Sequence, residues 1–134
     1  MTDPESVPDD LHIVFGRGGN GAARMNGWSF RANGEALQWE GLAPEQNQQA
    51  EGQIAPDTLR ALWGAVQEAA FFSWSQQEMG APSWFITVTA NGESHRVIWV
   101  RPLGQPADTT AAWEQLYTQL RTTAIQTFGE RPGM

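Results

Sequence analysis

The glycine-rich segment near the N-terminus is the first candidate for chemistry. Gly16-Arg-Gly-Gly-Asn-Gly21 matches the G-x-G-x-x-G pattern of nucleotide-binding loops. In a dinucleotide-binding fold that loop opens a helix, whose N-terminus holds the pyrophosphate. Here the following residues, 22 to 30, lead into an expected strand, and a protein kinase would need a longer chain and a lysine. We therefore expect a mobile glycine loop at this position and no phosphate site.

Metal ligands and nucleophiles are scarce in this chain. There is no cysteine, and the two histidines are too few for a convincing metal site. Asp9, Asp10 and His12 could hold a divalent ion, but they lie where an acidic tail meets a strand. His95 is expected to be a partly buried core histidine with its hydrogen bonds satisfied. We therefore assign no metal, no cofactor and no catalytic residue, while carboxylate pairs that form only in three dimensions stay open.

Seven tryptophans in 134 residues could indicate carbohydrate or peptide binding. A structural role explains six of them better, because they fall on helix stripes or on expected cross-strand pairs of the core. These six are Trp28, Trp39, Trp63, Trp84, Trp99 and Trp113. Trp74 has no such position and is a candidate exposed aromatic residue.

The charge of the chain restricts its partners. The net charge is −7, and all eight basic residues are arginines. Such a chain would be repelled by nucleic acid and by anionic membrane surfaces, whereas a basic protein partner would be attracted. No apolar run reaches the roughly 18 residues that cross a bilayer, so we expect no membrane insertion. We expect a cytoplasmic protein from the chain as given, or an exported or lipid-anchored one if a signal has been removed.

Two alternating segments around Asn33-Gly34 predict a β-hairpin. Asn-Gly is the strongest short-range hairpin signal, since both turn residues adopt positive φ in a two-residue loop. That loop would place Trp28 opposite Trp39 and Phe30 opposite Leu37. All four would then lie on one face of the sheet, with Ser29, Arg31, Gln38 and Glu40 on the other.

A second Asn-Gly hairpin is predicted around Asn91-Gly92. It pairs Trp84 with Trp99, Ile86 with Val97 and Val88 with His95 on the face assigned to the core. The other face carries Phe85, Thr87, Thr89, Ser94, Arg96 and Ile98. The shared Ala-Asn-Gly-Glu tetrapeptide at 32–35 and 90–93 is typical of convergent turns more than of duplication.

Each hairpin is followed by an expected helix. The first begins near Pro56, with an apolar stripe of Leu59, Leu62, Trp63, Val66 and Ala70. The second is capped by Asp108 or a neighbouring threonine and ends before Gly129. Its stripe is Trp113, Leu116, Tyr117, Leu120, Ala124 and Phe128.

These elements predict a single α+β domain. A strand at Leu11–Phe15 and a possible short strand at Gln49–Ile54 complete the order β-ββ-(β)-α-ββ-α. The expected domain covers residues 11–128, between flexible tails at 1–10 and 129–134. The simplest arrangement is an antiparallel sheet with both helices packed on its tryptophan-bearing face.

The remaining face of the second hairpin is the candidate binding surface. Phe85 lies opposite Ile98 there, Val100 is next to them, and Thr87 and Arg96 lie beyond. An apolar cluster with hydroxyls and an arginine at its edge suits a protein or ligand contact. In the alternative interpretation the loop 73–83, with Trp74 and Met79, folds over this face and completes a second small core.

Several segments resemble a bacterial family of small α+β domains of unknown function. These are Phe15-Gly16 before a strand, the Asn33-Gly34 turn, Gly52 to Pro56 entering a helix, and Ala69 to Phe72 leaving it. The resemblance covers about residues 11–125 and implies the fold given above. Members are often exported or lipid-anchored. Many carry cysteines around the first glycine loop, where this chain has Arg17 to Gly21, so no redox or metal role carries over.

Together these features favour a non-enzymatic interaction or ligand-binding domain that uses its open sheet face. The partner would be a protein or envelope component. An inhibitor or immunity-type protein, which binds a basic partner, also fits the small size and acidity. The alternative function is a small hydrolase or lyase with carboxylates in a cleft between sheet and helices.

Overall fold

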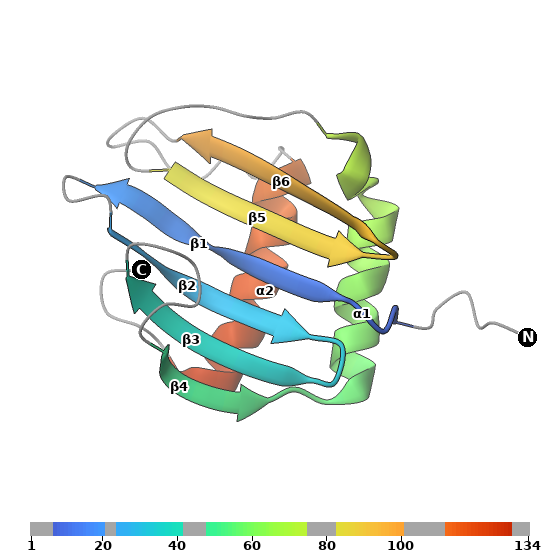
Figure 1. Ribbon diagram of the computed structural model, residues 1–134, viewed down its shortest axis with the longest axis horizontal. Coiled ribbons are helices and arrows are strands. Elements are labelled where there is room, and N and C mark those ends of the chain that lie inside the picture. Colours follow the sequence, from blue (N-terminus) through green and yellow to red (C-terminus); the bar gives the residue numbers. More distant parts are fainter. Residues whose placement is uncertain (1–6, 21–23, 42–47, 75–82, 101–111, 130–134) are drawn as a thin grey trace, which may run out of the picture.

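The computed structural model is an α+β fold with a six-stranded antiparallel sheet and two helices (Figure 1). It describes residues 7–20, 24–41, 48–74, 83–100 and 112–129. The sheet has the order β4-β3-β2-β1-β5-β6. The elements are β1 His12–Asn20, β2 Arg24–Arg31, β3 Glu35–Gly41, β4 Gln48–Gln53, α1 Pro56–Glu68, η1 Phe71–Ser73, β5 Ser83–Ala90, β6 Glu93–Val100 and α2 Ala112–Phe128.

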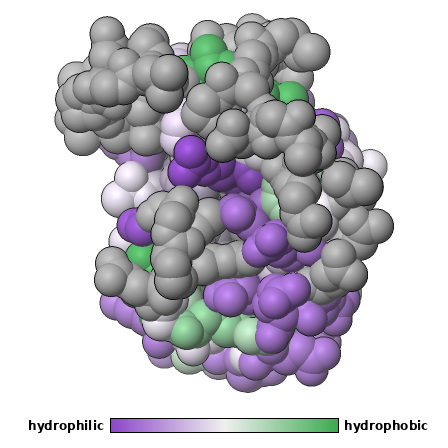
Figure 2. All heavy atoms as spheres, turned by 90° about the vertical axis from the view of Figure 1, so that its left-hand side faces the viewer, coloured by the Kyte–Doolittle hydropathy of each residue, from purple (hydrophilic) through white to green (hydrophobic). Residues whose placement is uncertain are grey.

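Both helices cover the same face of the sheet, which we call the first face (Figure 1). The main core lies between them and the sheet, and it contains the predicted stripe residues Leu59, Leu62, Trp63 and Val66 of α1. From α2 it contains Leu116, Tyr117, Leu120 and Ala124. Figure 2 shows the molecule from the left-hand side of Figure 1, and the described residues on that side are mainly hydrophilic.

The first helix ends earlier than its apolar stripe suggested. Ala70 is exposed and has the left-handed conformation, with φ of 53°, so it terminates α1 and does not extend the stripe. Its carbonyl accepts hydrogen bonds from the Ser73 N–H at 2.9 Å and from the Ser73 hydroxyl at 2.6 Å. This turn sends Phe71 into the core, where its side chain is fully buried.

The second hairpin has the register expected from its two-residue turn. Trp84 pairs with Trp99, Ile86 with Val97 and Val88 with His95. Asn91 and Gly92 both have positive φ, 53° and 79°. This is the conformation that a two-residue turn requires in order to follow the twist of the strands.

The first hairpin differs from the prediction by one residue. Gly34 has φ of 87° whereas Asn33 is not in the positive-φ region, and the Gly34 N–H donates to the Arg31 carbonyl at 2.9 Å. The loop therefore has three residues, with a turn followed by one left-handed glycine. Phe30 pairs with Ala36 and Trp28 with Gln38, so the predicted Trp28–Trp39 pair is wrong.

This difference changes the face on which β3 places its apolar side chains. Successive strand residues point to opposite faces, so a one-residue shift moves every side chain across the sheet. Trp28 and Phe30 stay in the main core, but Trp39 joins a separate cluster with Val14 and Phe85. We call the helix-free side that carries this cluster the second face.

The predicted glycine loop is also wrong for residues 16–20. Strand β1 continues through them to Asn20, and Gly16 pairs with Gly27 of β2 on one side and Phe85 of β5 on the other. A side chain would not fit there. A Cβ added to Gly16 would lie 2.2 Å from the Asn26 carbonyl oxygen, and one added to Gly27 would lie 2.1 Å from that of Phe15.

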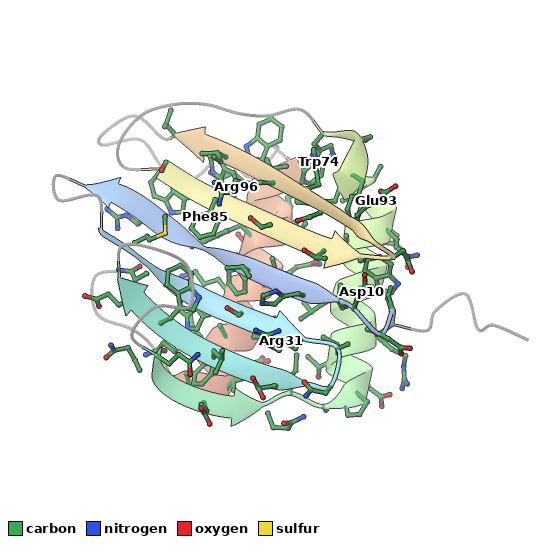
Figure 3. All side chains as sticks on the ribbon, viewed as in Figure 1. Asp10, Arg31, Trp74, Phe85, Glu93 and Arg96 are labelled. Carbon is green, nitrogen blue, oxygen red and sulfur yellow. The ribbon has the colours of Figure 1, made fainter. Side chains whose placement is uncertain are left out.

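Asp10, assigned by the sequence to the N-terminal tail, is bound to the second hairpin (Figure 3). Its carboxylate accepts the Asn91 N–H at 2.7 Å and the Gly92 N–H at 2.8 Å. The hydrogen bond from Gly92, followed by that from Asn91, lowers the pKa of Asp10 from its ordinary value of 3.8. Asp10 is therefore a structural carboxylate that ties the start of β1 to the β5–β6 turn.

Asp10→Asn should remove a pH-dependent part of the stability. Because the folded-state pKa is lowered, the carboxylate stabilises the fold above its unfolded pKa, and this contribution disappears as pH falls through the folded pKa. The wild type should therefore melt at a higher temperature than Asp10→Asn at pH 7, and the difference should shrink as pH falls below 3.8 and vanish only below the lower folded-state pKa. Thermal melts of both proteins from pH 7 to pH 2 measure this. A difference that stays constant over the whole range would contradict the role of the charge.

Candidate binding surface on the second face

The centre of the second face is built on the glycine pair of β1 and β2. The register places Phe85, Gly16, Gly27 and Trp39 side by side on β5, β1, β2 and β3. The Trp39 and Phe85 rings lie 6.2 Å apart between their centroids, although two strands separate them. Because the glycines have no side chains, the two rings lie over the backbone of β1 and β2 and contact each other.

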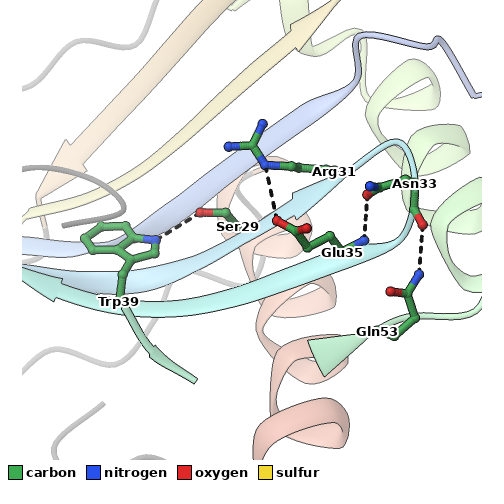
Figure 4. A network of polar contacts seen from close by, with 6 residues as sticks. All are labelled: Ser29, Arg31, Asn33, Glu35, Trp39 and Gln53. Carbon is green, nitrogen blue, oxygen red and sulfur yellow. Dashed lines mark hydrogen bonds and ion pairs between the residues drawn. The ribbon is translucent and has the colours of Figure 1, made fainter. Parts of the chain in front are cut away.

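Polar contacts hold this aromatic pair in position (Figure 4). The Trp39 indole N–H donates to the Ser29 hydroxyl at 3.1 Å, and both residues are fully buried. Two residues further along β2, Arg31 forms an ion pair of 3.7 Å with Glu35 of β3. A buried indole N–H without a partner would cost free energy. Because the Trp39 N–H is hydrogen-bonded, the Trp39 ring is held in place against Phe85. We call this pair of rings the floor of the second face.

Arg96 extends this floor toward the edge of the sheet (Figure 3). Its guanidinium carbon lies 5.9 Å from the centroid of the Phe85 ring, and its Nε donates to the Thr87 hydroxyl at 3.4 Å. Such a cation–π contact contributes about 0.5–1 kcal/mol at exposed sites. Thr89 and Ser94 are joined by a hydroxyl–hydroxyl hydrogen bond of 3.1 Å on the same face.

The structure brings five of the predicted site residues onto this face. Thr87, Ile98 and Val100 are half-buried and Arg96 is exposed, so they are accessible. Phe85 is only 5% exposed and packs with Trp39 and Val14. It therefore belongs to a second small core and forms the floor of the surface. Residues 75 to 82 of the loop proposed to cover it lie outside the part of the chain that the structure describes.

Trp74 does not belong to this surface. It is half-buried and packs against the main core, with ring centroids 5.2 Å from Phe71 and 6.2 Å from Trp113. Its carbonyl oxygen is hydrogen-bonded by the Nε2 atom of His95, which lies between the rings of Phe71 and Phe72. His95 is thus a partly buried histidine with a hydrogen-bond partner, as predicted.

The sequence did not identify Trp39 as a residue of the second face. The two-residue turn expected for Asn33-Gly34 placed it in the main core, and no sequence pattern pointed to Val14 or Met25. A usable signal was present in the glycines: Gly16 and Gly27 are strand residues without side chains. Large rings from neighbouring strands can cover such positions.

Two further carboxylates of the described residues, Glu114 and Asp57, make structural contacts. Glu114 is 4% exposed and accepts the Trp99 indole N–H at 2.7 Å. Asp57 pairs with Arg60 one turn further along α1. Among the residues described, no three His, Asp or Glu side chains lie close enough together to hold a metal ion. Glu114 is the buried carboxylate that the sequence did not single out.

No protein-family model matches the chain, and a search of the curated proteins finds no match. Within the described part of the chain, neither helix is long and apolar enough to cross a bilayer.

Proposed function

We propose that this protein is a non-catalytic binding domain that docks a protein partner on the β1–β5–β6 part of the second face. The observation that carries the proposal is the accessible group of Thr87, Arg96 and Ile98 on the floor of Trp39 and Phe85. No helix covers that face in the described part of the chain. Hydroxyls, an arginine and an aliphatic side chain on a preorganised floor match the composition of protein interfaces.

The charge favours a basic partner. The chain carries −7. The rest of the second face bears Glu51 and the Arg31–Glu35 ion pair, and Glu93 lies at the start of β6. A positive charge on the partner would raise the rate of association, and added salt would lower that rate. An inhibitor or immunity-type protein works in this way, because it occupies a basic surface without performing chemistry.

The alternative, a hydrolase or lyase, would rest on Glu114. One oxygen of this carboxylate already accepts the Trp99 indole N–H, and the cavities described between α1 and α2 are lined by other residues. The binding function has the better support, since its residues are accessible and lie together.

Ile98→Ser should weaken binding of the partner at least about fivefold. Ile98 lies opposite Phe85 in the middle of the proposed contact, and the minority of interface residues whose truncation costs more than about 1 kcal/mol cluster near the centre of an interface. The immobilised domain is exposed to cell extract at low salt, the retained protein is identified by mass spectrometry, and its affinity is then measured with purified protein.

Ile125→Ser is the matched control, since Ile125 is half-buried on α2 and lies away from this face. A partner bound equally well by the wild type and by both variants would place its contact elsewhere. If the wild type retains no protein, the proposal fails.

A further inference from the structure

A cavity lies where the β2–β3 loop, the start of α1 and the first described residues of the chain meet (Figure 1). Its volume is about 410 Å³, and sites for small molecules usually measure about 300–1,000 Å³. Its apolar residues belong to the main core or pack against it, so the cavity lies on the first face. It is therefore separate from the docking surface on the second face.

The wall that the β2–β3 loop contributes is fixed by hydrogen bonds to the segment before α1 (Figure 4). The Asn33 carbonyl accepts a hydrogen bond from Nε2 of Gln53 at 2.8 Å, and the Gly34 carbonyl accepts the Ile54 N–H at 2.9 Å. These bonds belong to the three-residue loop and join it to residues distant in the chain. The cavity is therefore preformed on this side, which lowers the entropy that a ligand would lose on binding.

The opposite wall is the N-terminal segment, which is held at two points. The Leu11 N–H donates to the Pro8 carbonyl at 3.1 Å, and the Asp10 carboxylate is bound to the β5–β6 turn. Asp9 lies between Pro8 and Asp10 and lines the cavity. These contacts fix the backbone on both sides of Asp9.

The floor of the cavity is apolar, and one of its two charged rim residues is already compensated. Ile54 and Leu59 are 4% and 2% exposed, and Val7 is half-buried against the same core. Arg60 lies at the rim and forms an ion pair with Asp57. The Arg60 charge is therefore balanced within α1.

The Asp9 carboxylate is the other charge at the rim, and it is accessible. Asp9 is exposed, and within the part of the chain that the structure describes its side chain has no hydrogen-bond or ion-pair partner. An ionised carboxylate only accepts hydrogen bonds. A ligand here must therefore present a donor, preferably a positively charged one, beside an apolar group.

We propose that this cavity binds a small amine with an apolar body. The ammonium group, which has three N–H donors, pairs with the Asp9 carboxylate. The apolar part of the ligand lies against Ile54 and Leu59 and leaves water. An anion of the same shape is repelled by Asp9, so the cavity selects by charge as well as by size.

NMR titration of the whole chain with ¹³C-labelled methyl groups tests the proposal. Phenethylamine, phenethyl alcohol and phenylpropionate share one apolar body and differ in charge, and each is added separately. Phenethylamine should shift the methyl signals of Ile54 and Leu59 saturably at concentrations up to about 20 mM, since ligands of this size bind in the millimolar range. The alcohol should bind more weakly, and the carboxylate should bind most weakly.

Asp9→Asn should weaken phenethylamine at least about threefold, because an exposed ion pair contributes up to about fivefold in affinity. The same variant should bind the alcohol as the wild type does, which separates the loss of the charge from a change in the cavity. Glu68→Gln is the control, since it removes one negative charge at the other end of α1. It should bind phenethylamine as tightly as the wild type does.

Three results would overturn the proposal. The first is that phenethylamine leaves both methyl signals unchanged. The second is that phenylpropionate binds as tightly as phenethylamine. The third is that Asp9→Asn binds the amine as tightly as the wild type does, or no more weakly than Glu68→Gln does.

Discussion

Phe85→Ala is expected to lower the free energy of unfolding by about 3–5 kcal/mol, as the loss of a buried phenylalanine ring does in other cores. Phe85 is 5% exposed, and it packs against Trp39 and carries Arg96 over its ring. Removing the ring leaves a cavity on the second face that the glycine pair beneath cannot fill. Urea denaturation with equal m-values for both proteins measures the change.

A double-mutant cycle with Trp39→Ala separates this cluster from the main core. The two rings should couple by about 0.5–1.5 kcal/mol, which is the range for aromatic pairs in contact. In the register that the sequence suggested, Trp39 lies on the opposite face and the coupling would be zero. A Phe85→Ala effect below 1 kcal/mol, or additive single effects, would show that this face has no second core.

Gly27→Ala is expected to cost at least about 1–3 kcal/mol, the range for overpacking a well-packed site. The new Cβ would lie 2.1 Å from the Phe15 carbonyl oxygen and 2.8 Å from the Cα of Gly16, so backbone atoms of β1 must move. The movement would displace the Trp39 and Phe85 rings that lie over this pair. Denaturation measures the cost, and loss of near-ultraviolet circular dichroism reports the displaced rings.

Gly64→Ala is the control for the same substitution. No atom lies within 4 Å of a Cβ built at Gly64, which is inside α1. Alanine is favoured over glycine in a helix interior by about 0.8–1.0 kcal/mol, so this variant should be more stable than the wild type. Equal effects of the two substitutions would mean that the close approach of β1 and β2 does not constrain Gly27.

Several features of the fold could be predicted from the pattern of residues. The 3.6-residue periodicity of Leu59, Leu62, Trp63 and Val66 determined which face of α1 is buried. The alternation in β5 and β6 determined which residues share a face, because it allows one register with a two-residue turn. For the candidate surface, Thr87, Arg96 and Ile98 were placed correctly together for this reason.

The tetrapeptide Ala-Asn-Gly-Glu occurs twice, at 32–35 and 90–93, and shows where local sequence is insufficient. At 90–93 it forms a two-residue turn, and the Asp10 carboxylate accepts both of its exposed N–H groups. At 32–35 it forms a three-residue loop, whose carbonyls at Asn33 and Gly34 accept hydrogen bonds from Gln53 and Ile54.

The sequence by itself determined that a turn forms at each Asn-Gly, since glycine at the second position adopts positive φ without steric cost. It did not determine the length of the loop, because the same tetrapeptide forms both loops and differs only in its contacts with residues distant in the chain. That choice sets the register of β3 and the face of Trp39. The main core and the β5–β6 part of the second face followed from local pattern, whereas the position of Trp39 beside Phe85 was decided by tertiary structure.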